Sequence, residues 1–332
     1  MAYLHSDREQ FRDAIDLAYE QTGVMVQAIE KDYYVTMLLR LLAQKMPYIV
    51  FKGGTSLSKC HKVIRRFSED IDITIDTLLS QGQKKKIKQA IVDSAEELGM
   101  TIENLDETRS RRDYNRYVIA YDSVIPMASD ALKAAVLLET SYTAVSFPTV
   151  LLPVHSYIGD MMEQEAPDAV EEYNLNPFEM KVQGIDRTLA DKVFAVCDYY
   201  LQGKVAKHSR HLYDIYKLLP LVPQDENFRE LVKEVRAVRA QSVICPSALP
   251  EANVPELLEK IIKEKAYKQV YDSLTTQLLE ENVPYDTVMV SFSCSDDAAP
   301  SERKGERICT FSMPLSCISK QYRSVIFSAV SS

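Results

Sequence analysis

The sequence predicts an α/β domain followed by a helical domain, and three patterns lead to that prediction. Short apolar runs typical of strands alternate with helical patterns up to about residue 140. A loose stretch with several prolines follows, and beyond residue 186 the apolar residues recur with helical spacing only. Strands are expected at 48–51, 69–76, 114–121, 132–140 and, inside the loose stretch, 178–182.

These patterns give expected domain borders at 1–150 for the α/β domain and 186–290 for the helical domain. Residues 151–185 are expected to be a linker, because prolines at 148, 153, 167 and 177 fall in or near them together with several acidic residues. From 291 to 332 the chain is rich in Ser and Cys without sustained periodicity. We expect this tail to be disordered or atypical, and the alternative to disorder is a frameshifted or readthrough end.

Helices are expected on both sides of the first strand. Ser6 and Glu9 match a capping box that opens a helix reaching about residue 22. A second helix is expected at 25–45, and its charged residues Glu30, Lys31 and Asp32 are taken as its solvent-facing side. Further helices are expected at 82–98, 186–195, 209–216, 226–242 and 254–281.

Composition sets the broad class of the protein. Of 332 residues, 46% are hydrophobic and 26% are charged, which is typical of a soluble globular protein. No apolar run approaches the roughly 20 residues of a membrane helix, and the N-terminal residues lack a signal peptide's pattern, so we expect the cytoplasm and no membrane. The six cysteines form no Cys-x-x-Cys pair, which indicates neither a zinc site nor a disulfide framework.

The net charge of −9 argues against nonspecific coating of nucleic acid, but it leaves room for a local basic groove. Two basic clusters exist. The lysines at 84, 85, 86 and 88 are expected to be the solvated face of a helix. The arginines at 109, 111, 112 and 116 precede or enter an aromatic-rich strand, and they are the better candidates for contact with nucleotide phosphate or an RNA backbone.

One stretch, residues 51–76, carries the strongest chemical signal. A buried strand is expected to end at the pair Gly53-Gly54, where the backbone can approach a ligand closely. Thr55 and Ser56 then offer N-cap hydroxyls and backbone N–H groups, which suit an anion such as phosphate. The stretch is not a Walker A loop, because Ser58 stands where the second glycine should be.

The next strand alternates Asp70, Ile71, Asp72, Ile73, so both carboxylates project from one face. Two adjacent carboxylates repel each other unless a cation lies between them, and hard oxygen ligands suit Mg²⁺. A phosphate seat beside a metal seat is the layout for nucleotidyl or phosphoryl transfer. The alternative is an edge strand with two solvated aspartates and an ordinary turn.

The segments Lys52–Lys59 and Arg66–Asp72 resemble the AbiEii/AbiGii family of nucleotidyltransferase-like toxins, which have the DNA polymerase β-type fold with a mixed sheet. The resemblance implies a toxin of a toxin–antitoxin or abortive-infection system, with MenT-type relatives that add nucleotides to transfer RNA. It also implies nucleotide-binding roles for Lys52, Gly53, Gly54, Thr55, Ser56 and Lys59, and metal-binding roles for Asp70 and Asp72.

Enzymes of this fold use a third carboxylate from a neighbouring strand, and Glu139 is the candidate here. Its implied role is metal ligand or general base toward the incoming hydroxyl. The alternative is an exposed glutamate at a strand end.

Two later segments, 186–195 and 209–216, also resemble motifs of this family. By that resemblance Lys192 would hold the triphosphate, Asp214 would orient Lys192 or the acceptor, and Arg210 would bind the nucleotide. A lysine would neutralise charge on the phosphates in the transition state. His211 departs from the aspartate usual in the family. Without the resemblance, we would expect Lys192 to be a surface residue.

Taken together, the residues and the resemblance predict a nucleotidyltransferase that depends on Mg²⁺ or Mn²⁺ and moves NMP from NTP to an RNA 3′ end. The preference for tRNA and a cognate antitoxin as partner are implied by the family resemblance. Two metal ions would bridge the triphosphate. Two alternatives stay open. One is transfer to a small molecule, which needs only a closed pocket beside the site. The other is a catalytically idle module that binds nucleotide or a partner protein.

Overall fold

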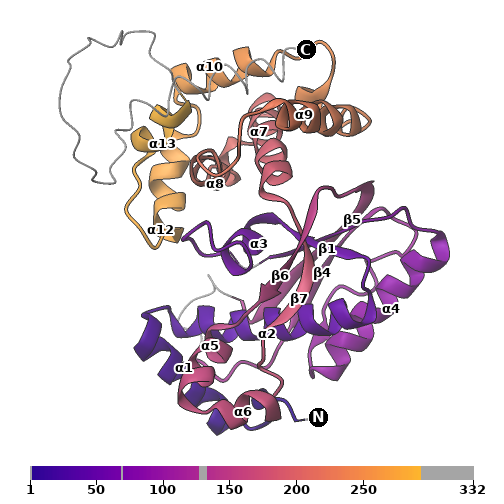
Figure 1. Cartoon of the computed structure of the whole chain (residues 1–332), viewed down its shortest axis with the longest axis vertical. Coiled ribbons are helices and arrows are strands. Elements are labelled where there is room, and N and C mark those ends of the chain that lie inside the picture. The colour runs from indigo at the N-terminus through magenta and orange to yellow at the C-terminus, as the bar shows by residue number, and fades with distance from the viewer. Residues whose placement is uncertain (1, 69, 127–132, 293–332) are drawn as a thin grey trace. The chain divides into compact units, whose positions relative to one another are not determined.

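The computed structural model describes residues 2–68, 70–126 and 133–292 (Figure 1). The chain divides into two compact units. The first comprises Met1–Val63 and Phe67–Gly184, and the second comprises Ile64–Arg66 and Ile185–Ser332. The short segment Ile64–Arg66 therefore belongs to the second unit although the first unit surrounds it in the sequence.

The first unit is built on a seven-stranded mixed sheet with the order β3-β4-β5-β2-β1-β7-β6. The strands are β1 (Ile49–Lys52), β2 (Ile71–Ile75), β3 (Thr101–Ile102), β4 (Tyr114–Ala120), β5 (Ala135–Val145), β6 (Thr149–Val154) and β7 (Phe178–Gln183). The β2–β5 and β1–β7 pairs are parallel, and the other neighbours are antiparallel. The expected α/β domain with a mixed sheet is confirmed.

The helices of this unit are α1 (Arg8–Thr22), α2 (Val26–Lys45), α3 (Gly53–Lys59), α4 (Gln81–Glu97), α5 (Tyr157–Glu165) and α6 (Pro167–Glu172). The first of them begins one residue later than the expected capping box. Its N-cap is Asp7, whose Oδ1 accepts hydrogen bonds of 3.1 Å from the backbone N–H groups of Glu9 and Gln10. A carboxylate at this position also complements the positive end of the helix dipole.

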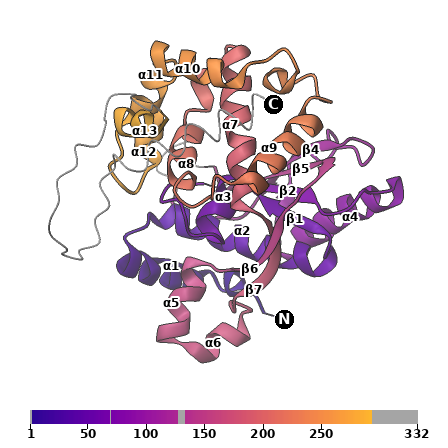
Figure 2. The same cartoon turned by 45° about the horizontal axis from the view of Figure 1, so that its top comes forward.

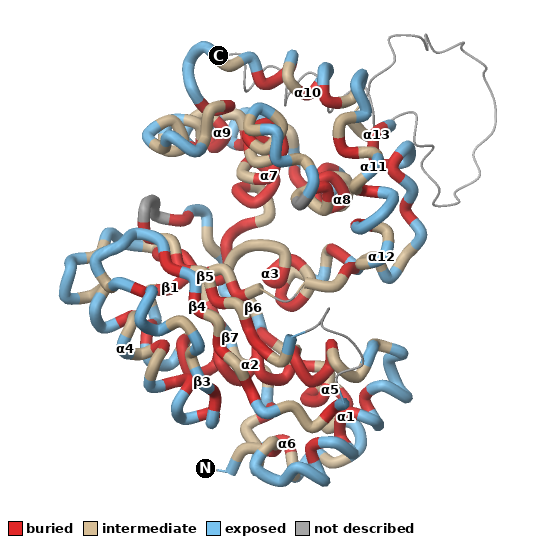
Figure 3. The backbone as a smooth tube through the Cα atoms, turned by 180° about the vertical axis from the view of Figure 1, so that it is seen from behind, coloured by how far each residue is buried: buried red, intermediate tan, exposed pale blue. Residues whose placement is uncertain are grey.

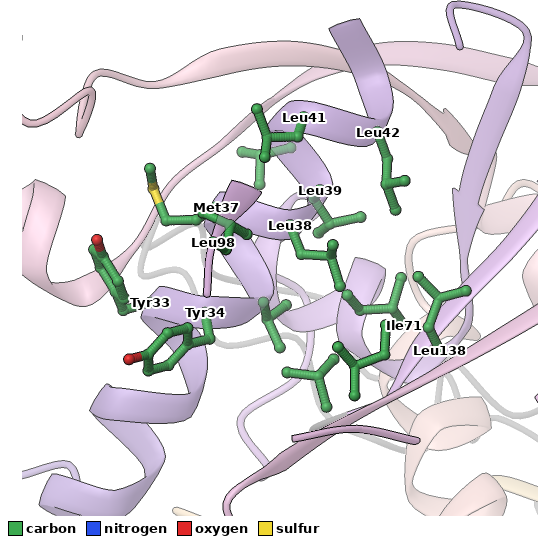
Figure 4. Close-up of a cluster of buried hydrophobic side chains, with 14 of the residues drawn as sticks. Tyr33, Tyr34, Met37, Leu38, Leu39, Leu41, Leu42, Ile71, Leu98 and Leu138 are labelled. Carbon is green, nitrogen blue, oxygen red and sulfur yellow. The ribbon is translucent and has the colours of Figure 1, made fainter. Parts of the chain in front are cut away.

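Helix α2 lies in the core against one face of the sheet, where Leu38, Ile71 and Leu138 come together (Figure 4). Much of α2 and of the central strands is coloured as buried in Figure 3. Ile71, Ile73 and Ile75 of β2 are all buried, as strand alternation predicted. The opposite face of β2 is therefore the one that carries Asp72.

The charged run of α2 is not a solvent-facing side, which corrects the expectation for Glu30, Lys31 and Asp32. Glu30 and Lys31 are buried, and the Glu30 carboxylate accepts hydrogen bonds from Ser123 Oγ (2.6 Å) and Val124 N (2.7 Å). Burial raises the pKa of Glu30 despite these bonds. A buried carboxylate that fastens a loop cannot be told from a solvated one by helical spacing alone.

The stretch expected to be a linker is folded. Residues 151–185 hold most of β6 together with α5, α6 and β7, and β7 pairs with β1 inside the sheet. The first unit accordingly runs to Gly184, well beyond residue 150. Prolines misled the prediction because they stand where a sheet tolerates them. Pro153 lies in β6, the last strand of the sheet, and Pro167 is in the first turn of α6.

The second unit is helical, as predicted (Figure 2). Its main helices are α7 (Ile185–Leu201), α8 (Arg210–Leu218), α9 (Glu226–Arg239), α10 (Val254–Glu264) and α13 (Tyr285–Phe292), with short α11 (Lys268–Val270) and α12 (Thr276–Leu278) around a π-helical turn (Tyr271–Thr275). Helix α7 packs against α8, α9 and α10. The single helix expected at 254–281 is interrupted because Lys265 adopts a left-handed conformation that ends α10.

Helix α13 ends at Phe292 and therefore includes the first two residues of the expected tail. The rest of the expected tail lies outside the described residues. None of the helices in the described part of the chain combines the length and apolar character needed to cross a membrane.

Candidate functional site

Four charged residues form one row across four neighbouring strands of the first unit. In the strand registers, Lys52 of β1 pairs with Asp72 of β2, Asp72 pairs with Glu139 of β5, and Glu139 pairs with Arg116 of β4. Residues paired across adjacent strands project from the same face. The sheet thus presents two carboxylates side by side, with a cation on each flank.

One further side chain belongs to this face by strand alternation. Tyr114 lies two residues before Arg116 within β4, whereas Asp70 directly precedes β2 and lies just outside its register with β5. Arg116 Nε is 3.7 Å from Glu139 Oε1. Burial, the negative charge of Glu139 and a hydrogen bond to that carboxylate raise the pKa of the Tyr114 phenol. The structure therefore sets Asp72 and Glu139 side by side on one face, and Asp70 lies just before the strand that carries Asp72.

Gly53 is the point where the glycine turn meets this row. Its φ is +82°, and a Cβ there would lie 1.9 Å from Oδ2 of Asp72 and 2.8 Å from its Cγ. Only glycine leaves room for the Asp72 carboxylate beside the turn. The glycine turn and Asp72 therefore lie against each other within the first unit.

The hydroxyls of the turn hold the turn itself together. Helix α3 begins at Gly53, with Lys52 as its N-cap, so Thr55 and Ser56 are inside the helix and are not its caps. Ser56 Oγ donates to the carbonyl of Gly53 (3.0 Å), and Thr55 Oγ1 lies 2.9 Å from Ser68 Oγ. Both side chains are buried. What the turn offers to an anion is therefore its backbone N–H groups.

Lys59 is buried at the end of α3, where its ammonium bonds to Asp32 and to the carbonyl of His155. The other Asp32 oxygen accepts a 3.0 Å bond from the backbone N–H of Tyr157. Lys59 thus fastens α3 to α2 and to the segment before α5. Its ammonium is engaged inside the fold, which is a structural position and differs from the expected contact with nucleotide.

A separate cluster of charged side chains lies inside the second unit. Asp214 of α8 accepts bonds from Arg66 Nε (2.6 Å to Oδ1) and Nη2 (2.8 Å to Oδ2), and from Lys192 Nζ (2.6 Å to Oδ2). All three residues are buried. Burial alone raises the pKa of Asp214, but the charges of Arg66 and Lys192 outweigh it and hold that pKa well below its ordinary value. Burial lowers the pKa of Lys192, and Asp214 opposes this change.

Two neighbours complete this cluster. His211 Nδ1 lies 3.5 Å from Lys192 Nζ, and burial followed by the charge of Lys192 holds the pKa of His211 well below its ordinary value. His211 is therefore neutral near pH 7. Arg210 is half-buried in the first turn of α8. The expected pairing of Lys192 with Asp214 is present, and Lys192 is not a surface residue.

The site's residues suit a divalent cation that arrives with a nucleotide. Among the side chains that the structure describes, no group of three or more His, Cys, Asp or Glu residues is arranged to hold a metal ion. Mg²⁺ commonly takes only one or two carboxylates and completes its coordination with substrate phosphates and water. The close approach of Asp72 to the glycine turn fits that arrangement, since it sets carboxylate oxygens beside backbone donors for phosphate.

Comparison with known families decides the assignment. Residues 36–291 match the family model described as "Nucleotidyl transferase AbiEii toxin, Type IV TA system". The chain belongs to the AbiEii family. The match spans both units and includes the glycine turn, the carboxylate row, Lys192 and Asp214.

Among solved structures, the chain is similar to MenT4, the nucleotidyltransferase toxin Rv2826c from Mycobacterium tuberculosis H37Rv. The identity is 16%, the alignment covers 95% of this chain and 89% of that chain, and the TM-score is 0.43. No curated protein matches the chain.

Membership of the AbiEii family establishes the general activity. The chain is a nucleotidyltransferase and a toxin of a type IV toxin–antitoxin system. An NTP substrate, a divalent metal and an antitoxin partner follow from the same membership.

Sequence reasoning did not assign a role to Arg66, although this residue opens the quoted Arg-Phe-Ser-Glu-Asp motif. Its two bonds to Asp214 cross 148 positions of sequence, so no local pattern reveals them. Tyr114 was likewise missed as a site residue. Its position could have indicated a role, because Tyr114 lies two residues before Arg116 in the same strand. Both side chains are therefore on the face of Glu139.

Gly53→Ala is expected to lower nucleotidyl transfer on the order of 10²-fold, because the new methyl group displaces the Asp72 carboxylate. Gly99→Ala is the matched control. Gly99 also has a positive φ (+64°), but a Cβ there meets nothing within 4 Å. Both variants place a side chain at a positive φ and are strained there, but only the first puts the new Cβ against Asp72. Equal activities of the two purified variants would contradict the role given to Gly53.

Proposed function

We propose that the chain transfers an NMP unit from Mg²⁺-bound NTP to the 3′ end of an RNA, with tRNA as the preferred acceptor. The observation that carries this proposal is the paired row Lys52–Asp72–Glu139–Arg116, joined to the glycine turn at Gly53. Nucleotidyl transfer needs oxygen ligands for a metal beside donors for phosphate, and this row supplies both. tRNA is the acceptor implied by the resemblance of the sequence to the AbiEii/AbiGii family and its MenT-type relatives.

The chain's own residues have distinct roles in this proposal. Asp70 and Asp72 would hold Mg²⁺, or Mn²⁺ in its place, with the phosphates of NTP. The bound metal supplies neutralisation of charge that develops on the phosphates and the departing pyrophosphate. The backbone N–H groups after Lys52 would bind the triphosphate. Glu139, beside Asp72 in the register, would be a metal ligand or would accept the proton of the acceptor hydroxyl.

Residues beyond the row have proposed roles as well. Lys59 is proposed to position α3 through its buried bonds to Asp32 and the carbonyl of His155. In the second unit, Lys192 and Arg210 are proposed as nucleotide-binding residues, and Asp214 is proposed to fix the ammonium of Lys192. NTP and tRNA are cytoplasmic molecules, so we propose that the reaction takes place in the cytoplasm.

The test is incorporation of each α-³²P-labelled NTP into total RNA by the purified protein with Mg²⁺. We expect a labelled RNA band that disappears on addition of EDTA. Label in a small molecule of the cell extract, with none in RNA, would favour the small-molecule alternative. NTP binding without release of pyrophosphate would favour an idle binding module.

A further inference from the structure

Two half-exposed side chains of β4 border the carboxylate row. The strand alternates, so Asn115 and Tyr117 are buried while Tyr114 is 50% exposed and the Arg116 side chain is 53% exposed. The buried pair supplies the packing of β4 against the core. Tyr114 and Arg116 are therefore not needed to hold the strand in the fold, and their face is the face of Glu139.

The order of strands gives the carboxylate row two different sides. Along β1, β2, β5 and β4 the residues follow as Lys52, Asp72, Glu139 and Arg116. The glycine turn lies at the β1 side, next to Asp72. This step rests on the proposed function, which places the triphosphate at that turn. The acceptor then has the other side, beyond Glu139, where β4 lies.

The side beyond Glu139 has the chemistry that single-stranded nucleic acid requires. Bases stack on aromatic rings, and guanidinium groups bind phosphates. The turn before β4 adds three exposed arginines, at 109, 111 and 112. That turn is fixed by Asn115, whose side chain accepts a bond from Arg109 N (2.8 Å) and donates one to Arg109 O (3.0 Å).

We propose that Tyr114 and Arg116 bind the 3′-terminal nucleotide of the RNA acceptor. The Tyr114 ring stacks on its base, and the Arg116 guanidinium binds its phosphate. The arginine turn at 109–112 binds the preceding phosphates and carries the strand away from the row. A small acceptor would have no use for that turn, whereas an RNA strand needs a continuous positive path from the site.

The experiment compares the full-length wild type with Tyr114→Ala, Tyr114→Phe and Arg116→Ala. Tyr19→Ala is the matched control, because Tyr19 is 49% exposed on α1 of the same unit. The probe is a fluorescein-labelled, mixed-sequence single-stranded RNA of about 12 nucleotides, which spans a typical single-strand site. We expect Tyr114→Ala to raise the KM and Kd for this RNA about 10-fold to 100-fold, the usual effect of losing one stacked base.

The KM for NTP is expected to stay at the wild-type value in Tyr114→Ala, and Tyr114→Phe is expected to keep wild-type RNA affinity because the ring remains. Arg116→Ala should weaken RNA binding and flatten its salt dependence. A Tyr114→Ala variant that raises the KM for NTP and leaves that for RNA unchanged overturns the proposal.

Fluorescence anisotropy without NTP separates this inference from the proposed reaction. Equal RNA Kd values for wild type and Tyr114→Ala, or no RNA binding by the wild type, overturn the inference even if transfer occurs elsewhere. RNA binding that depends on Tyr114 supports the inference, and the absence of transfer in the same protein would contradict only the proposed reaction.

Discussion

Replacing Asp214 with alanine is expected to lower the free energy of unfolding of the second unit by about 3–5 kcal/mol, the usual cost of breaking a buried ion pair on one side. The variant leaves the buried cations Arg66 and Lys192 without their shared carboxylate. Asp286→Ala is the matched control in the same unit, because its ion pairs with Lys265 and Lys268 are exposed. Urea unfolding followed by circular dichroism measures both variants. An Asp214→Ala midpoint equal to that of the control would contradict this assignment.

The same cluster predicts a dependence of stability on acid. Burial raises the pKa of Asp214, but Arg66 and Lys192 hold it below its unfolded value, so the folded state keeps its carboxylate ionised at lower pH than the unfolded chain does. The resulting stabilisation is fully present above about pH 4 and is lost as the pH falls further, toward the folded pKa. We expect the wild-type urea midpoint to fall more steeply below pH 4 than that of Asp214→Asn. Parallel curves would contradict the linkage.

Asp72→Asn is expected to abolish toxicity, since the amide keeps the shape of the side chain but removes the charge that binds a metal with NTP. Loss of such a group lowers transfer on the order of 10³-fold. Induced expression of the wild type should arrest growth, and cells with Asp72→Asn should grow as cells without the toxin do. Asp76→Asn is the matched control, because Asp76 follows the other end of β2 and pairs with Lys181. Immunoblots confirm equal protein levels. Growth arrest by Asp72→Asn would remove the carboxylate row from the mechanism.

Much of the fold could be predicted because its elements have strong local patterns. The alternation Ile71, Ile73, Ile75 fixed both the strand and the face that carries Asp72. Prediction failed where tertiary contacts override local cues. The edge strand β6 contains Pro153, and Glu30 is buried because a distant loop supplies its hydrogen bonds. Neither the edge position of β6 nor the burial of Glu30 can be predicted from the residues close to it in the sequence.

The candidate site divides in the same way. The sequence predicted that Asp70 and Asp72 share a face, since that follows from a period of two. It proposed Glu139 only through the family resemblance, and the β2–β5 register now sets this residue beside Asp72. Gly53 lies close to Asp72 because Lys52 of β1 pairs with Asp72 of β2. These two strands are separated in the sequence by α3, so local patterns do not predict the contact. Asp214 also accepts hydrogen bonds from Arg66. This arginine belongs to the second unit, but its short segment is flanked in the sequence by the first unit, so residue spacing could not reveal the contact.

The most direct test of the central claim is binding of Mn²⁺ with NTP, followed by electron paramagnetic resonance, for the wild type and Asp72→Asn. The account predicts that the wild type binds Mn²⁺ tightly when a non-hydrolysable ATP analogue is present, and that Asp72→Asn loses this bound signal while Asp76→Asn keeps it. Equal binding of Mn²⁺ and nucleotide by Asp72→Asn and the wild type would contradict the claim that the row of Asp72 and Glu139 is the site of nucleotidyl transfer.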